Sequence, residues 1–317
     1  MRTFLRRLTV FLLLFGAVAV GLDLLLKEGL RRRTTGTFGV WNRVVQGRMD
    51  AEVLLLGSSR ALMHFDAKAI GERTGLRCFT IGMDGNQIGH QLPWLITHLK
   101  HNPAPRLLVQ NVDIISLAPD TDVFFPSQYP PYLNEDAVYD DLLRTDPTWW
   151  KDRWIPLYSF ARFGHGYAGI AAKGLLGLED TLNDPLSLGF QRKDVAWDGT
   201  FDRFVAANPD GVRRANTDEA RRTLATLIRT AQDAGMRVVL VYTPELAEMQ
   251  RLTRDRERLI GTFRGIADEA GVPFWDFSGA DICQDRRWFY NSQHLNGAGV
   301  DRFTPMLADS IAAFLAR

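Results

Sequence analysis

The amino-acid sequence predicts an α/β protein, a three-layer α/β/α sandwich around a parallel five-stranded sheet, with a transmembrane helix at its N-terminus. This prediction rests on three observations. Short, continuously apolar runs are typical of strands that helices cover on both faces. Amphipathic segments of helical length separate these runs, in the order that builds a right-handed parallel layer. One further apolar run, near the N-terminus, reaches the length of about 20 residues that a bilayer requires.

The N-terminal segment has the pattern of a membrane anchor. Three arginines among the first seven residues precede an apolar run over residues 8–26, which Asp23 interrupts near its end. Residues 17–19 (Ala-Val-Ala) also fit a signal-peptide cleavage site, but the apolar run continues beyond them, which favours an uncleaved signal anchor. Basic residues flank both ends, so charge leaves orientation open, and a reversed anchor with a cytoplasmic domain is the alternative. We expect a single-pass inner-membrane protein, with residues 1–35 as anchor and juxtamembrane segment and residues 36–317 as a periplasmic domain.

The first half of the sheet is predicted from three apolar runs. They lie at residues 52–57, 77–81 and 106–110, and the first reads Glu-Val-Leu-Leu-Leu-Gly. Asp66 is placed to cap a helix that ends near Gly75, because a short acidic side chain accepts from the free N–H groups of a helix start and glycine suits its end. An amphipathic helix follows the second run.

Residues 115–215 interrupt this alternation of strands and helices. Prolines and aromatic residues are frequent there, and no further strand–helix unit is visible. We predict a long insertion of helices and loops that serves as a lid or a partner surface. Its aromatic side chains form either a small core beneath the insertion, which we favour, or a platform that stacks on sugars.

The α/β pattern resumes after the insertion. A helix is predicted over residues 217–234, followed by a strand over 237–242. A charged helix over 246–270 and a short strand over 272–277 come next, and an amphipathic helix over 298–316 closes the chain.

Composition excludes several classes of protein. The formal net charge is +1, and the basic residues form no stripe interleaved with aromatics, so no nucleic-acid partner is expected. The two cysteines, Cys78 and Cys283, are too few for a metal cluster and are expected to be separate buried thiols. The histidines show no metal-ligand spacing with acidic partners, so the sequence implies neither a metal nor a cofactor.

Polar residues gather at the predicted carboxyl ends of the strands, the edge at which open α/β sheets bind ligands. Ser59 follows the first strand, Gly85 lies in the loop after the second, Asn111 follows the third, and His294 lies in the loop after the fifth. A serine hydroxyl needs a base to take its proton, and histidine does so near neutral pH, so these residues indicate acyl transfer or ester hydrolysis. We predict Ser59 as the nucleophile and His294 as the base, with Ser58 as a rival nucleophile.

The oxyanion that forms in such a reaction needs hydrogen-bond donors already in place. The backbone N–H groups of Ser59 and Gly85 and the side-chain amide of Asn111 are the predicted donors. Each donor of this kind is typically worth about 10² to 10³ in rate.

These motifs resemble the SGNH, or GDSL-like, hydrolase superfamily over about residues 50–115 and 217–316. The superfamily has four short sequence blocks, and each has a counterpart in this chain. Gly57-Ser58-Ser59 stands for Gly-Asp-Ser of the first block, and Gly82 to Gly85 for the second, whose glycine donates to the oxyanion. Asn111 stands for the asparagine of the third block, and Asn291 to His294 for Asp-x-x-His of the fourth. The resemblance implies a flavodoxin-like fold. His294-Leu295-Asn296 is similar to a membrane-anchored bacterial branch that includes relatives of teichoic-acid D-alanylation and alginate O-acetylation proteins.

The sequence departs from the family pattern at the triad acid, where Asn291 stands in place of aspartate. A carboxylate there fixes the histidine tautomer and stabilises the imidazolium, and its neutralisation in a serine protease costs about 10⁴ in rate. Three outcomes are open. Another acid, Asp276 or Asp285, serves instead; a Ser–His dyad suffices, with a backbone carbonyl orienting the ring; or the site binds ligand without catalysis.

The residues and the resemblance together predict a serine-dependent acyl-ester hydrolase or O-acyltransferase that acts on an acylated cell-envelope glycan or another acyl ester. The alternative is a catalytically weak or inactive relative that binds glycan, or a membrane acyltransferase, in exopolysaccharide assembly. Asn291 favours this alternative, whereas the serine, glycine, asparagine and histidine motifs disfavour it.

Overall fold

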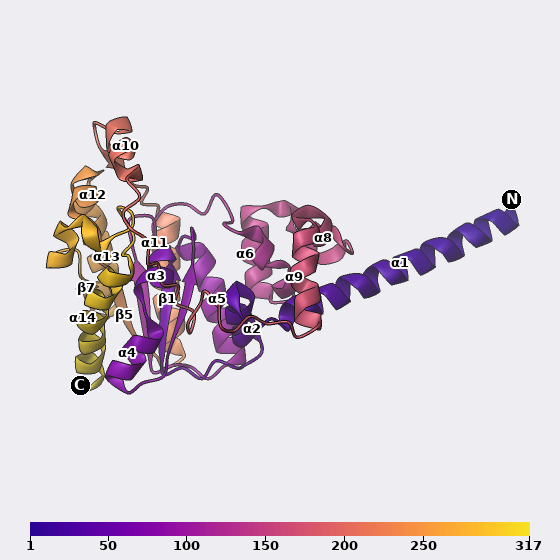
Figure 1. Cartoon of the computed structure of the whole chain (residues 1–317), viewed down its shortest axis with the longest axis horizontal. Coiled ribbons are helices and arrows are strands. Elements are labelled where there is room, and N and C mark those ends of the chain that lie inside the picture. Colours follow the sequence, from indigo (N-terminus) through magenta and orange to yellow (C-terminus); the bar gives the residue numbers. More distant parts are fainter.

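A five-stranded parallel sheet forms the centre of the computed structural model, which describes residues 1–317 (Figure 1). The strand order is β2-β1-β3-β5-β7, and every pairing is parallel. The strands are β1 (Val53–Ser58), β2 (Cys78–Met83), β3 (Leu107–Val112), β5 (Arg237–Tyr242) and β7 (Phe274–Asp276). Every residue of β1 and β3 is buried, which explains their unbroken apolar sequence. The predicted fold class is therefore confirmed.

Helices cover both faces of the sheet (Figure 1). On one side α4 (Ala67–Thr74) packs against α14 (Gly297–Leu315). On the other, α11 (Asp218–Asp233) packs against α5 (Ile88–His101) and α13 (Arg256–Ala270). The strand order reverses direction between β1 and β3, the switch point at which doubly wound sheets bind their ligands.

Helix caps stand where the sequence places them. Asp66 accepts a hydrogen bond from the backbone N–H of Ala69, and Gly75 ends α4 in the left-handed conformation with φ of 73°. Thr217 caps α11 by accepting from the N–H of Ala220. These local signals were readable because each one satisfies a backbone group at a helix end.

The predicted charged helix over residues 246–270 is wrong in one respect, because two helices fill this stretch. They are α12 (Ala247–Leu252) and α13, and between them β6 (Thr253–Arg254) pairs with β4 (Val212–Arg213). Asp255 then adopts a left-handed conformation with φ of 56° and starts α13. A contact between distant segments thus overrides helical propensity at this point.

The N-terminal helix α1 (Arg2–Arg31) projects from the body of the protein (Figure 1). It is the one helix that is long and apolar enough to cross a membrane. Its apolar side chains stay exposed from Phe4, at 65% exposed, to Leu24, at 62%. Residues 4–23 cover about 30 Å at 1.5 Å per residue, which matches the hydrocarbon core of a bilayer.

The last two turns of α1 pack against the globular body. Asp23 forms an ion pair with Lys27 at 2.9 Å and accepts from the N–H of Leu157 at 2.9 Å. Leu30 is completely buried. The charge within the apolar run is therefore buried against protein rather than facing lipid.

Helix α9 (His165–Leu175) crosses α1 at very close range. A Cβ atom added at Gly29 would collide with the carbonyl oxygen of Ala171, and one added at Gly174 would collide with the carbonyl oxygen of Gly29. Small residues allow helix backbones to approach in this way. The insertion thus holds the base of the N-terminal helix.

We expect Gly174→Ala to lower the stability of the full chain by about 1–3 kcal/mol, because the added methyl group forces α9 away from α1. Gly169→Ala is the matched control on the same helix, where nothing lies within 4 Å of the added Cβ. Thermal unfolding in detergent micelles measures both. An unchanged or higher melting temperature for Gly174→Ala would contradict the close crossing, since alanine is the better helix former.

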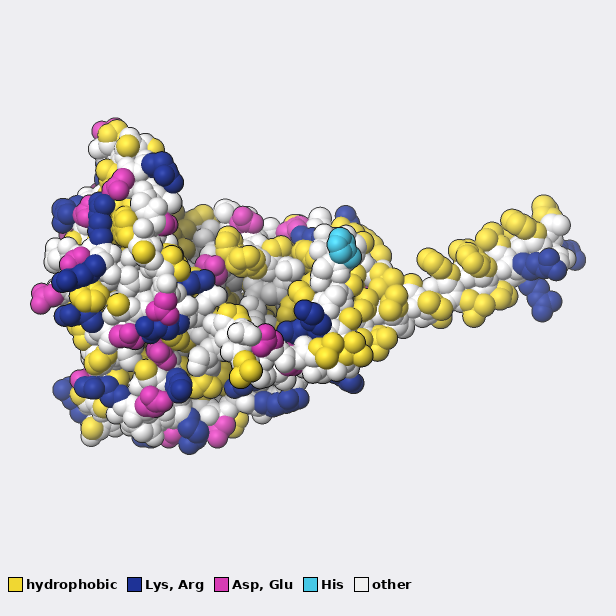
Figure 2. All heavy atoms as spheres, in the orientation of Figure 1, with side chains coloured by type: hydrophobic (Ala, Val, Ile, Leu, Met, Phe, Trp, Pro, Cys, Tyr) yellow, Lys and Arg dark blue, Asp and Glu magenta, His cyan; other side chains and the backbone are white.

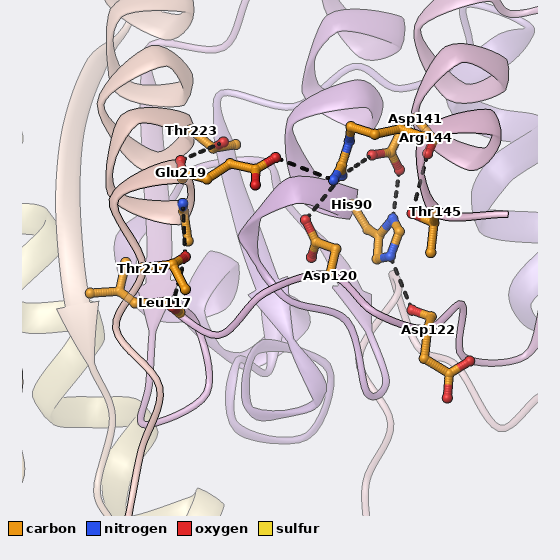
Figure 3. A network of polar contacts seen from close by, with 11 residues as sticks. His90, Leu117, Asp120, Asp122, Asp141, Arg144, Thr145, Thr217, Glu219 and Thr223 are labelled. Atoms are coloured by element: carbon orange, nitrogen blue, oxygen red, sulfur yellow. Dashed lines mark hydrogen bonds and ion pairs between the residues drawn. The ribbon is translucent and has the colours of Figure 1, made fainter.

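A buried polar network ties the insertion to the helices of the core (Figure 3). His90 of α5 contacts the carboxylate of Asp141, in α6 (Asp136–Thr145), at 2.5 Å and the backbone carbonyl of Asp122 at 3.1 Å. Both partners of the ring are acceptors, so both ring nitrogens carry protons. Arg144 bridges Asp120 and Asp141 at 3.0 and 2.7 Å.

A main-chain hydrogen bond also joins the two ends of the insertion. The backbone N–H of Thr217 donates to the carbonyl of Leu117 at 2.9 Å (Figure 3). No strand of the main sheet lies between these two residues.

Burial alone would lower the pKa of His90, but the carboxylates of Asp141 and Asp120 raise it above its ordinary value. We expect His90→Gln to cost about 1.5–3 kcal/mol below pH 6.5, where the charged hydrogen bond contributes fully. This cost should shrink as the pH rises through the folded-state pKa. Thermal unfolding from pH 5.5 to 9 measures it, with the exposed His165→Gln as control. A cost that grows with pH would show that the ring is neutral.

Candidate active site

A hydrogen bond joins Ser59 to His294 across 235 residues of sequence. Ser59 is the first residue of α3 (Ser59–His64), directly after β1, and His294 lies in the loop between β7 and α14. The distance from Ser59 Oγ to His294 Nε2 is 2.8 Å. Ser59 is 7% exposed, so its hydroxyl lies in a largely water-excluded place. The two residues have the geometry of a nucleophile and its base.

Asn291 orients the histidine ring from its other side. Its Oδ1 lies 3.0 Å from His294 Nδ1 and also accepts the backbone N–H groups of Gln293 and His294, both at 3.0 Å. Two backbone donors therefore fix the oxygen, rather than the amide nitrogen, toward the ring. Nδ1 then carries the proton, which leaves the lone pair of Nε2 facing Ser59. Cysteine proteases use an asparagine in the same position of a Cys-His-Asn chain.

The charge around His294 favours its neutral form. Burial, together with the positive charges of Arg60 and Lys193, lowers the pKa of His294 to about 3. No carboxylate contacts the ring to offset these effects, because Asn291 holds that position. The imidazole is therefore an unprotonated acceptor at every pH at which the protein is expected to work.

Two further rings hold the imidazole in place. Tyr290 stacks on His294 with ring centroids 5.4 Å apart, and its hydroxyl donates to Met63 Sδ. His64 packs edge-on at 6.1 Å and accepts the backbone N–H of Leu295. Burial also lowers the pKa of His64 well below its ordinary value. Together these contacts restrict ring rotation.

Ser58 points away from His294. Its hydroxyl contacts the carboxylate of Asp113 and the Oδ1 of Asn111, and its oxygen caps α3 through the N–H of Arg60. This residue is 1% exposed. Ser58 thus has the role of a helix cap, and the geometry favours Ser59 over this rival.

Asn111 forms no hydrogen bond with Ser59, and its observed contacts disfavour its predicted place in the oxyanion hole. It lies inside β3, in register with Val241, and not beyond the end of the strand. Its amide donates to the backbone carbonyls of Val112 and Val241, and its oxygen accepts from Ser58. A fully buried amide that is engaged in this way has no donor to offer an oxyanion.

The two substitute acids also lie apart from the histidine. Asp276 binds the N–H and hydroxyl of Ser278, and Asp285 binds Arg287. Both nitrogens of His294 already have other partners, so neither Asp276 nor Asp285 completes a triad. Arg60, which follows Ser59, is 1% exposed and donates to the carbonyls of Thr243 and Pro244.

The second-strand loop reaches the same edge of the sheet. Ser58 pairs in register with Met83, so Ser59 lies one residue beyond β1 and Gly85 two residues beyond β2. Gly85 has φ of 71°, and a Cβ there would meet the ring of Phe124. A Cβ at Gly82 would collide with the backbone of Leu62 in α3. Both glycines are needed for close packing around the serine turn.

Two cavities lie within reach of these elements. A pocket of about 420 Å³ is lined by residues that include Phe38, Met63, Asp84 and Lys193. A second, of about 510 Å³, is lined by no apolar residue and by five arginines at the base of α1. Only the first adjoins groups that surround His294, and its size is typical of small-molecule sites.

Sequence reasoning missed Tyr290, His64 and Lys193. Tyr290 and His64 carry no motif, because their role is to pack against a ring that only the fold brings near. Lys193 belongs to the insertion, and its carbonyl accepts the N–H of Gly297 at 2.8 Å, which brings it beside α14. A tyrosine directly before the Asn291 motif was the one available signal.

Fold and site together define a doubly wound α/β protein that carries a Ser–His–Asn hydrogen-bonded chain. No protein-family model and no curated protein sequence matches this chain. Among solved structures, that of a predicted acylhydrolase from Bacteroides fragilis is similar over 83% of this chain and 87% of its own. Its TM-score is 0.41 and its identity 10%, a likeness that carries no conclusion about activity.

The positive charges near His294, which no carboxylate offsets, make the protonation state of the ring testable. We expect the ring to remain neutral at pH 5, because its pKa is lowered to about 3. Asn291→Asp places a carboxylate beside Nδ1, which should raise the pKa by about 1–3 units. NMR of histidine-labelled full chain measures both, and His294→Gln assigns the signal. A wild-type titration near 6.5 would contradict the burial of the ring.

Proposed function

We propose that this protein is a membrane-anchored, periplasmic serine hydrolase or O-acyltransferase of the SGNH type, acting on acyl esters of a cell-envelope glycan. The observation that carries the proposal is the 2.8 Å hydrogen bond from Ser59 to a histidine whose other nitrogen is held by Asn291. Motif resemblance supports the family and the glycan; the site geometry supports the chemistry.

The proposed reaction starts with transfer of the Ser59 proton to His294 Nε2 as Oγ attacks the acyl carbon. The tetrahedral oxyanion accepts from the backbone N–H groups of Ser59 and Gly85, without help from Asn111. Collapse of this intermediate expels the alcohol, which takes the proton from Nε2 and leaves an acyl-serine. Water or a sugar hydroxyl then attacks the acyl carbon through the same base and regenerates Ser59.

Asn291 supplies orientation without charge in this mechanism. In a serine protease, aspartate-to-asparagine replacement is costly because the amide selects the wrong tautomer. Here the backbone donors of Gln293 and His294 turn the Asn291 oxygen toward the ring, so the productive tautomer survives. The imidazolium that forms during catalysis still lacks a counter-charge. We therefore infer a slow but competent nucleophile.

The proposed location follows from α1. The basic N-terminal residues would stay in the cytoplasm, residues 4–23 would cross the inner membrane, and the body would lie in the periplasm. In that arrangement residues 24–35 join the 36–317 domain, and the 115–215 insertion braces the anchor. The 420 Å³ pocket is the proposed place for the acyl ester, because its lining residues Asp84 and Lys193 can bind polar groups and the charge of Lys193 also acts on His294.

The rival function is a non-catalytic component that binds glycan or a membrane acyltransferase. The absence of a triad carboxylate is the observation that favours it. In that case Ser59 would have the reactivity of an ordinary serine.

Reaction of the full chain with a fluorophosphonate probe separates the two functions. Serine Oγ attacks phosphorus, fluoride leaves, and the proton passes to His294. We expect wild type to be labelled, Ser59→Ala to be unlabelled, and His294→Ala to react about 10² to 10⁴ more slowly. Asn291→Ala should also slow labelling, on the order of 10², because the ring loses its orientation.

Ser58→Ala is the matched control, which should still be labelled because Ser58 serves as a cap. The experiment uses the full chain in detergent, since truncation at residue 36 would remove the buried contacts of Asp23 and Leu30. Absence of label on a folded wild type would overturn the catalytic proposal. Label that persists in Ser59→Ala would overturn the assignment of the nucleophile.

A further inference from the structure

We infer that α7 to α9 of the insertion form a collar that lies in the lipid interface of the same bilayer that α1 crosses. The collar comprises α7 (Trp150–Trp154), α8 (Tyr158–Phe163), α9 and the turn that follows it. The inference rests on the proposed function only in taking α1 as a membrane anchor. Its occupant is the headgroup and upper acyl region of a phospholipid bilayer.

The collar exposes an unusually large number of apolar side chains for a surface that faces water. The exposed fractions are Trp150 47%, Trp154 68%, Ile155 40%, Ile170 38%, Leu176 71% and Leu178 58%. Figure 2 shows hydrophobic side chains gathered around the base of α1, over α8 and α9. Large apolar patches of this kind mark interaction sites, and exposed tryptophans are typical of membrane interfaces.

Position identifies the lipid as the occupant. The collar has a small core of its own, Leu30 with Phe160, Tyr167 and Ala171, which fixes α8 and α9 against α1. Leu157 binds Asp23, the residue at which the exposed apolar span of α1 gives way to protein contacts. The exposed side chains of the collar are thus continuous with a surface that lipid already covers.

The form of the collar also fits a bilayer surface. Helix α9 runs steeply across α1 (Figure 1), so with α1 through the membrane α9 extends along its surface. Amphipathic helices lie in the interface in this way, with their apolar side chains in the upper acyl region. The arginine-lined cavity at the base of α1 adds positive charge. Three of its guanidinium groups, Arg31, Arg43 and Arg48, form no ion pair, which favours anionic headgroups.

Lipid contact can be measured at single cysteines in the full chain. The native thiols do not interfere, because burial raises the pKa of Cys78 to about 12 and that of Cys283 to about 11. Leu176→Cys and Leu178→Cys place a fluorescent maleimide label on the collar. Val205→Cys is the matched control, an exposed aliphatic residue (37%) of α10 (Thr200–Ala207), which lies far from α1 (Figure 1).

The labelled chains are reconstituted in vesicles of phosphatidylcholine and phosphatidylglycerol, with or without brominated acyl chains. We expect bromine to reduce fluorescence at least twofold at residues 176 and 178 and to leave residue 205 unchanged. Resistance of the chain to carbonate extraction tests the anchor in the same samples.

Each outcome decides the inference. A chain that carbonate extracts overturns both the anchor and the collar. A chain that resists extraction but shows no quenching at residues 176 and 178 overturns the collar alone and leaves a protein partner as its occupant. Quenching at all three positions overturns the collar as a specific surface. Failure of fluorophosphonate labelling alone would leave the collar standing.

Discussion

The contact between Asn291 Oδ1 and His294 Nδ1 decides what the site can do. Two backbone N–H groups fix the orientation of the amide, and the amide fixes the tautomer of the ring. Only that tautomer presents a lone pair to Ser59. A neutral partner also leaves burial and the nearby cations unopposed, so the pKa of the base lies far below its ordinary value. Asn291 thus orients the ring toward Ser59, but as a neutral group it does nothing to raise the pKa of His294. The ring is correctly placed but weakly basic, and it faces a hydroxyl that is itself mostly shielded from water.

The sheet order explains how residues so far apart in sequence meet. β1 lies next to both β2 and β3, so the turns after β1 and β2 emerge side by side at one edge. The loop after β7 reaches that edge because α14 packs back across the sheet against α4. His64, on the short helix that Ser59 begins, then accepts the N–H of Leu295 and links the segments of Ser59 and His294 directly. The serine turn and the histidine loop are therefore joined twice, once through each histidine.

Much of this architecture could be predicted because its causes are local. Continuous apolar runs located all five strands, and Asp66 and Gly75 marked helix ends through backbone groups that they satisfy. The position of Asn111 within β3 could not be predicted, for a non-local reason. Whether an asparagine ends a strand or lies within it depends on pairing with the neighbouring strand. Asn111 pairs with Val241 of β5, so it lies within β3 rather than in the loop where the family motif places it. The same limit applies to Tyr290 and Lys193, whose roles exist only through the packing of segments that the sequence leaves unconnected.

Helix α1 and the site are connected through a continuous series of contacts. A carboxylate within an apolar helix would be costly in lipid. Asp23 instead accepts a backbone N–H of the insertion, and Gly29 allows the two helices to touch through their backbones. The insertion in turn is tied to the core through the contact of His90 with Asp141 and the ion pair of Arg144 with Glu219. Motion of the body relative to α1 would break these contacts. Ser59 is consequently held at a fixed position relative to α1.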